Sequence, residues 1–126
     1  MSLVSPLRRV LGAGPARSGV HHWWMQRLTS LALVPLSIWF VASLLFLPGF
    51  DHLTVIAWIA RGWTALLLML FILSSAWHSN LGLQVIIEDY VHDERWKLFT
   101  LMANTFFAFA VGLAAVFAIL KLSFGL

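Results

Sequence analysis

His78 is the one ionisable residue in the middle of any long apolar stretch of this chain. Burying such a group without a partner costs on the order of several kcal/mol, so an imidazole at that depth is expected to bind something. Gly82 follows one helical turn later and lacks a side chain where a planar macrocycle would approach the backbone. Together, His78 and Gly82 predict that the chain binds a planar macrocycle. Two plainer interpretations stay open: an imidazole bonded to a carbonyl of another helix, and a glycine for close helix packing.

A second polar group ends the same stretch. Asp89 lies about 20° from His78 on a helical wheel, and the only tyrosine, Tyr90, lies about 18 Å farther along the helix. A phenol at the membrane boundary can donate a hydrogen bond to a quinone carbonyl, and the adjacent carboxylate can orient it or relay protons. The alternative, which the residues alone favour, is an interfacial tyrosine with solvated acids.

Basic residues precede the first apolar stretch. The Arg27 guanidinium matches carboxylates such as heme propionates, and it is equally suited to anchor a helix end at the membrane surface. A six-coordinate heme needs two axial ligands, yet the other four histidines lie outside the depth of His78. If His78 binds heme, the second ligand must come from another chain. These four histidines are His21, His22, His52 and His92.

The elements that position these residues follow from three windows without Asp, Glu, Lys or Arg, at residues 28–50, 62–87 and 98–120. At about 1.5 Å per residue, each window is long enough to cross a hydrocarbon core of about 30 Å. The pattern predicts an all-α membrane protein with three transmembrane helices, near residues 27–48, 54–88 and 96–122. It is expected to form a single domain over residues 1–126, with a segment 1–20 before the first helix.

The amino-acid composition agrees with a membrane protein and excludes other classes of protein. The chain is 61% hydrophobic and 10% charged, against about 45–50% and about 25% in soluble domains. Its eight Lys and Arg residues are too few and too scattered for a nucleic-acid footprint, so no nucleic-acid partner is expected. It has no cysteine, which excludes iron–sulfur ligation by this chain. Any iron must be bound through nitrogen.

The distribution of charge predicts the orientation. Six basic residues flank one side of the predicted helices and two flank the other, which places the N-terminus inside, on the cytoplasmic or matrix side, and the C-terminus outside. Tryptophans near the helix ends are expected to form aromatic belts, and Asn104 is expected to bond across to another helix. The basic residues are Arg8, Arg9, Arg17, Arg27, Arg95 and Lys97 against Arg61 and Lys121; the tryptophans are Trp23, Trp24, Trp58, Trp63 and Trp96.

Two segments together carry a resemblance to a known family. Residues 78–90 combine His78, Gly82, Asp89 and Tyr90 in an H-x3-G…D-Y pattern that resembles helix 2 of the smaller, D-type membrane anchor of succinate dehydrogenase. Residues 19–27, which read GVHHWWMQR, resemble the segment before helix 1 of that family. The resemblance extends over all three predicted helices in length and order.

The resemblance implies a complex of four subunits: a flavoprotein that oxidises succinate with FAD, an iron–sulfur protein, and two anchors that share heme b. Carried over by position, His78 is one axial ligand, beside Gly82, and the larger cytochrome b anchor supplies the other. Tyr90 becomes a hydrogen-bond donor to ubiquinone, supported by Asp89. Arg27, with His21 or His22, would meet the heme propionates, and the tandem histidine leaves open which of the two does so.

Other functions remain to be weighed. The anchor of a fumarate reductase runs the same electron path backwards and one anchor sequence does not separate the two. A small multidrug-type transporter needs a membrane-embedded acid, and no Asp or Glu lies inside the three windows. A structural assembly factor would need neither His78 nor Tyr90. The expected surroundings are membrane lipid, with a bacterial inner (cytoplasmic) membrane preferred to the mitochondrial inner membrane.

Overall fold

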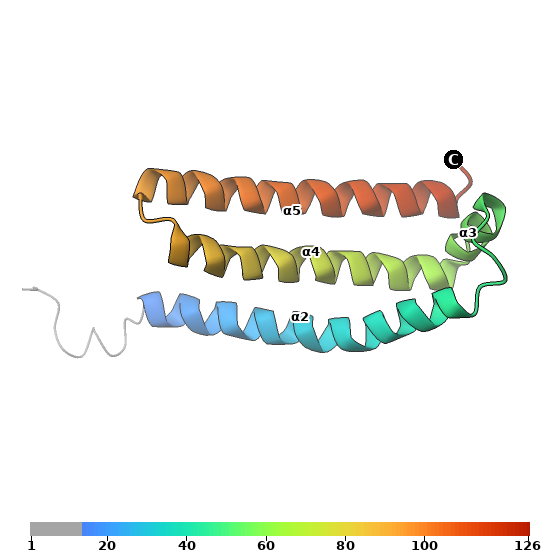
Figure 1. Cartoon of the computed structure of the whole chain (residues 1–126), viewed down its shortest axis with the longest axis horizontal. Coiled ribbons are helices and arrows are strands. Elements are labelled where there is room, and N and C mark those ends of the chain that lie inside the picture. The colour runs from blue at the N-terminus through green and yellow to red at the C-terminus, as the bar shows by residue number, and fades with distance from the viewer. Residues whose placement is uncertain (1–13) are drawn as a thin grey trace, which may run out of the picture.

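The computed structural model describes residues 14–126, which form four helices and no strand (Figure 1). They are α2 (Gly14–Leu45), α3 (His52–Ile59), α4 (Gly62–Tyr90) and α5 (Glu94–Ser123). Three segments are long and apolar enough to cross a membrane, namely Val20–Leu45, Gly62–Tyr90 and Glu94–Ser123. The prediction of an all-helical protein with three membrane spans is therefore confirmed.

The first helix begins earlier than predicted, at Gly14 instead of residue 27. Pro15 follows Gly14, and proline suits the first turn because its fixed φ is helical and its missing N–H would have no partner there. His21 and His22 consequently lie on α2 and not before it. Of the predicted N-terminal segment 1–20, residues 14–20 are helical, and residues 1–13 lie outside the described part of the chain.

The predicted second helix, residues 54–88, is in fact two helices. α3 closes at Ala60, whose backbone N–H donates to the carbonyl of Ile56, and Arg61 is extended, with φ −66° and ψ 119°, before α4 begins. The prediction of one continuous helix was wrong because the chain turns at residues 60–61, and this turn lays α3 against both α4 and α5. Charge-free windows detect the membrane span but not this turn.

Aspartates at two helix starts explain the other boundaries. Asp51 caps α3 by accepting from the backbone N–H of Thr54 at 3.1 Å and from its hydroxyl at 2.6 Å. The Thr54 hydroxyl, with the backbone bond, lowers the pKa of Asp51. Asp93 caps α5 by accepting from the N–H groups of Arg95 and Trp96, so α5 starts two residues before the predicted residue 96.

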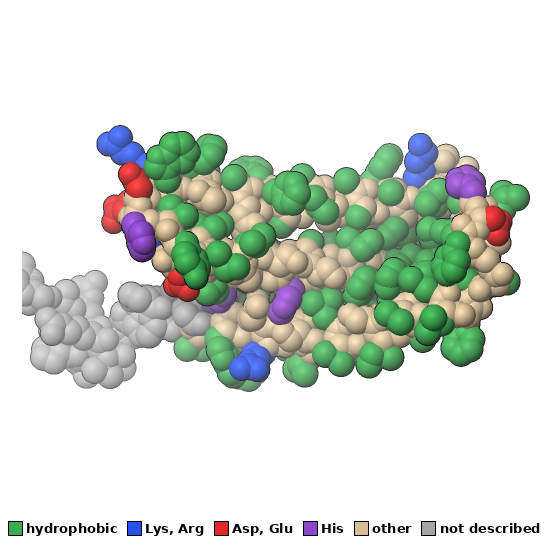
Figure 2. All heavy atoms as spheres, in the orientation of Figure 1, with side chains coloured by type: hydrophobic (Ala, Val, Ile, Leu, Met, Phe, Trp, Pro, Cys, Tyr) green, Lys and Arg blue, Asp and Glu red, His purple; other side chains and the backbone are tan. Residues whose placement is uncertain are grey.

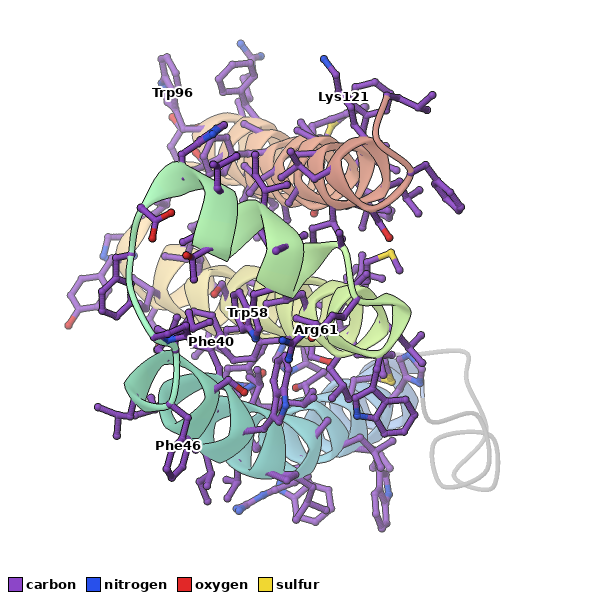
Figure 3. The ribbon with its side chains drawn as sticks, turned by 90° about the vertical axis from the view of Figure 1, so that its right-hand side faces the viewer. Phe40, Phe46, Trp58, Arg61, Trp96 and Lys121 are labelled. Atoms are coloured by element: carbon purple, nitrogen blue, oxygen red, sulfur yellow. The ribbon has the colours of Figure 1, made fainter. Side chains whose placement is uncertain are left out.

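The three long helices form a layer with α4 in the middle (Figures 1 and 3). α4 contacts α2 on one side and α5 on the other, while α2 and α5, as far as residues 14–126 are concerned, do not contact each other. The helices alternate in direction, so the start of α2 and the C-terminus lie at opposite ends. The layer has two ends: the Tyr90 end, where α4 finishes, and the α3 end.

A small core lies at the α3 end. Trp58 is only 8% exposed and packs with Ala65, Leu68 and Ile119. Its indole stacks on Trp39 with 6.2 Å between ring centroids, and Figure 3 shows it beside Phe40 between the long helices. The predicted belt position of Trp58 is therefore wrong, because the turn before α4 folds this ring inward. The other predicted belt tryptophans are exposed: Trp23, Trp24, Trp63 and Trp96.

The interface between α4 and α5 contains a buried amide pair. The Asn104 side chain donates to the Asn80 carbonyl at 3.1 Å and to the Asn80 side-chain oxygen at 2.8 Å. Asn80 is 4% exposed, so each amide satisfies a polar group that lipid could not. The expected bond from Asn104 to a neighbouring helix is confirmed. Large apolar side chains cover much of the remaining surface (Figure 2).

Candidate functional site

His78 on α4 is half-buried and joins α4 to α2. Its Nδ1 lies 2.9 Å from the Thr29 hydroxyl oxygen, and Thr29 is 9% exposed. No other hydrogen bond of this ring is seen among residues 14–126. The sequence left open a bond from His78 to a backbone carbonyl, and the observed partner is instead a side chain that reasoning from the sequence did not single out. Figure 2 shows a histidine in the seam between the lower two helices, about midway along the layer.

Gly82 leaves open space beside His78. A Cβ atom built on Gly82 would meet nothing within 4 Å, whereas one built on Gly112 would meet Leu73 at 3.8 Å and Ala76 at 3.9 Å. Gly112 is thus the glycine that lets α4 and α5 pack closely. Within residues 14–126, Gly82 has no such packing role. For this part of the chain, the structure therefore gives no support to the interpretation of Gly82 as a glycine for close helix packing.

Two buried polar atoms on α2 lie toward the Tyr90 end from Thr29. They are His22 Nε2 and Gln26 Oε1, and neither has a hydrogen-bond partner among the described residues. His22, Gln26 and Thr29 follow an i, i+4, i+7 spacing, so they share one face of the helix over about 10 Å. His21, by contrast, is exposed. Of the tandem histidines, His22 is therefore the one that is partly enclosed.

Gln26 and Thr29 were not identified from the sequence. The available signal was their spacing from His22, because three polar residues at i, i+4 and i+7 form one stripe along a helix face. Only the fold shows that Thr29 in this stripe meets α4.

Arg27 is not brought into this seam. Its side chain is exposed, and its guanidinium lies 5.3 Å from the centroid of the Trp23 ring, over the ring face. Two helical positions separate Arg27 from Thr29, so the two side chains leave the helix about 160° apart. A cation on an indole at this boundary fits a surface anchor.

Asp89 and Tyr90 lie in the last turn of α4, away from His78. Both are exposed, Tyr90 to 78%. The last turn of α4 holds Glu88 and Asp89 and no basic residue, although the negative end of a helix dipole disfavours carboxylates. Asp93 caps α5, but Glu88 and Asp89 have no comparable role in stabilising α4. Glu88, Asp89 and the exposed Tyr90 are therefore polar groups at the Tyr90 end that the chain's own folding does not explain.

The structure thus forms two separate polar sites, the His78–Thr29 seam and the Tyr90 surface. A cavity of about 390 Å³ is lined by residues of α5, and one of about 150 Å³ by residues of α4 and α5; both linings are largely apolar and include neither His78 nor Tyr90. No group of three His, Cys, Asp or Glu side chains able to hold a bare metal ion occurs within residues 14–126.

Comparison with known proteins identifies the family. Residues 1–119 match the family described as Succinate dehydrogenase/Fumarate reductase transmembrane subunit. The succinate dehydrogenase hydrophobic membrane anchor subunit of Rickettsia bellii is 32% identical over 106 residues, which cover 84% of this chain and 85% of that one. The subunit of the same description from Paracoccus denitrificans is 26% identical over 125 residues, covering 99% and 96%. With three membrane spans and a match over nearly its whole length, this chain belongs to the family of succinate dehydrogenase and fumarate reductase transmembrane subunits, as a hydrophobic membrane anchor of the succinate dehydrogenase type.

Proposed function

We propose that this anchor binds heme b together with a second, larger cytochrome b anchor, and that it forms part of the ubiquinone site of a succinate:quinone oxidoreductase. The observation that carries the proposal is the half-buried His78 imidazole, tied to Thr29 through Nδ1, beside open space at Gly82. An imidazole that is hydrogen-bonded through one ring nitrogen can bind a metal through the other.

The residues of the seam fit a heme. A porphyrin already holds its iron through four nitrogens, so this chain needs to supply one axial ligand and not a cluster of three. Because α2 and α4 are antiparallel, His22, Gln26 and Gly82 all lie toward the Tyr90 end from the His78–Thr29 bond. His22 Nε2, which has no partner among the described residues, can donate to a propionate carboxylate when it carries a proton. Arg27 remains a candidate for the same role only if its side chain leaves Trp23. When bound, the heme would supply a one-electron redox centre.

The second axial ligand is expected from the larger anchor. The described histidines other than His78 lie near helix ends: His21 and His22 toward the start of α2, His52 at the start of α3, and His92 between α4 and α5. None of them reaches the depth of His78. The heme site is therefore incomplete without a second chain, in agreement with an anchor that works only inside its complex.

Tyr90 and Asp89 are assigned to the quinone. The exposed phenol donates a hydrogen bond to a quinone carbonyl, and the Asp89 carboxylate next to it orients the phenol or relays protons. The unexplained acids at the end of α4 and the exposure of Tyr90 support a surface that the iron–sulfur subunit covers. Succinate chemistry belongs to the FAD-containing flavoprotein, and this chain contributes binding and electrostatics.

An optical spectrum tests the proposal directly. The complex purified through this chain is expected to show a Soret band and, after reduction by succinate, the sharper visible bands of a ferrous b-type heme. A complex that contains the chain in full amount but has no Soret band would contradict the heme assignment and favour an assembly or purely structural role. Redox titration of the heme and identification of the co-purified quinone distinguish a succinate dehydrogenase from a fumarate reductase.

The orientation is a separate prediction. From the excess of basic residues that flank the Tyr90 side of the helices in the sequence, we predict that this end faces the cytoplasm of a bacterial inner membrane and that the C-terminus is outside. Reporter fusions after Leu126 are expected to behave as external, and fusions within residues 93–97 as internal. The reverse pattern would put Tyr90 on the side opposite to succinate and remove it from the quinone site.

A further inference from the structure

The hydrogen bonds around Thr29 determine which nitrogen of His78 carries the proton. The Thr29 oxygen lies 2.8 Å from the Met25 carbonyl and 3.0 Å from the Gln26 carbonyl, and 2.9 Å from His78 Nδ1. A hydroxyl has one proton to donate, and a carbonyl has none. If that proton pointed to His78, the Thr29 oxygen would face two carbonyl oxygens at hydrogen-bond distance with no proton between them.

The arrangement that leaves the fewest of these three contacts without a proton runs in one direction. His78 Nδ1–H donates to Thr29, and the Thr29 hydroxyl donates to a backbone carbonyl of α2. In a neutral imidazole the other nitrogen, Nε2, then has a free lone pair. The carbonyls belong to a continuous helix, and Thr29 is nearly enclosed, so this end of the chain of bonds is held rigidly.

We propose that Thr29 is a positioning residue for His78: it holds the Nδ1–H tautomer and the ring orientation that present Nε2 as the axial ligand. The inference rests on the proposed heme function and extends it to α2. The donated bond also increases the electron density of the ring, because an imidazole whose N–H is bonded is a more basic ligand. Such a ligand favours ferric over ferrous iron.

The test compares four variants in the assembled complex, of which Thr29→Ala is a second way to remove the hydroxyl. Thr29→Val keeps the branched shape and removes the hydroxyl, Thr29→Ser keeps the hydroxyl, and Ser30→Ala is the matched control. Ser30 donates to the same Gln26 carbonyl at 2.8 Å but has no bond to His78. The readouts are heme per complex after detergent washing and the midpoint potential of the heme by redox titration.

For Thr29→Val we expect heme retention to weaken by about 10- to 100-fold, the usual effect of removing such an outer partner, and the midpoint potential to rise. A tenfold preferential loss of ferric affinity corresponds to about 59 mV for one electron. Thr29→Ser and Ser30→Ala are expected to keep the wild-type potential and heme content. Wild-type potential and heme content in Thr29→Ser but not in Thr29→Val would show that the hydroxyl of residue 29 is responsible.

Each other outcome contradicts the inference. If Thr29→Val lowers only the thermal stability of the complex and leaves potential and heme content unchanged, the bond is a simple contact between helices. If neither Thr29→Val nor Thr29→Ala assembles while Ser30→Ala does, Thr29 is a structural residue. A failed heme assignment is recognised separately, since His78→Ala would then keep the heme spectrum; loss of that spectrum with an unchanged Thr29→Val overturns only the positioning role.

Discussion

A complex that carries His78→Ala is expected to lose the heme b bands from its reduced-minus-oxidised spectrum. The substitution replaces the only ionisable group in the middle of a membrane span by a methyl group, which cannot bind iron. None of the other described histidines is placed to substitute for the lost ligand, because they lie near helix ends.

The His78 experiment has a matched control on the same chain. His52→Ala removes an exposed imidazole at the α3 end and should leave the spectrum unchanged. The amount of complex is followed independently through its FAD content, so that loss of heme is separated from loss of the complex. A wild-type spectrum in the His78→Ala complex would disprove the ligand assignment. Some quinone reduction is expected to remain if electrons pass from the iron–sulfur subunit to quinone without using the heme.

Tyr90→Phe is expected to reduce succinate–quinone reductase efficiency by roughly ten- to a hundredfold, equivalent to about 1–3 kcal/mol of lost stabilisation. The substitution keeps the ring at the membrane boundary and removes only the hydroxyl. A hydrogen bond to a quinone carbonyl strengthens as negative charge develops during reduction, so its loss affects the reaction more than binding. A tyrosine with a purely interfacial role would tolerate the change.

Two rates measured side by side isolate the quinone step in Tyr90→Phe. Succinate oxidation with a dye that accepts electrons upstream should stay at the wild-type rate, and the heme spectrum should be unchanged. Trp96→Phe is the matched control, because Trp96 is another exposed aromatic residue at the Tyr90 end with no assigned role in quinone binding. If the quinone and dye rates of Tyr90→Phe both equal those of wild type, the quinone site is built without this phenol.

The sequence alone determined the membrane architecture. Charge-free windows located the three spans because a helix is the one structure that satisfies its backbone hydrogen bonds inside a single segment in lipid. The same reasoning predicted the bond made by Asn104, because a polar side chain within a span needs a partner on another helix. His78 and Gly82 could be selected for a similar reason: each departs from what an apolar span requires.

Tertiary structure decided which side chains meet. Whether His21 or His22 turns inward, and whether Arg27 reaches the seam, depends on the rotation of α2 about its axis relative to α4, and that rotation depends on packing between helices. The partnership of Thr29 and His78 joins residues 49 positions apart, which no local pattern encodes. The turn at Arg61 and the burial of Trp58 likewise arise from α3 packing onto its neighbours, because hydropathy measures how apolar a segment is and not the direction in which it runs.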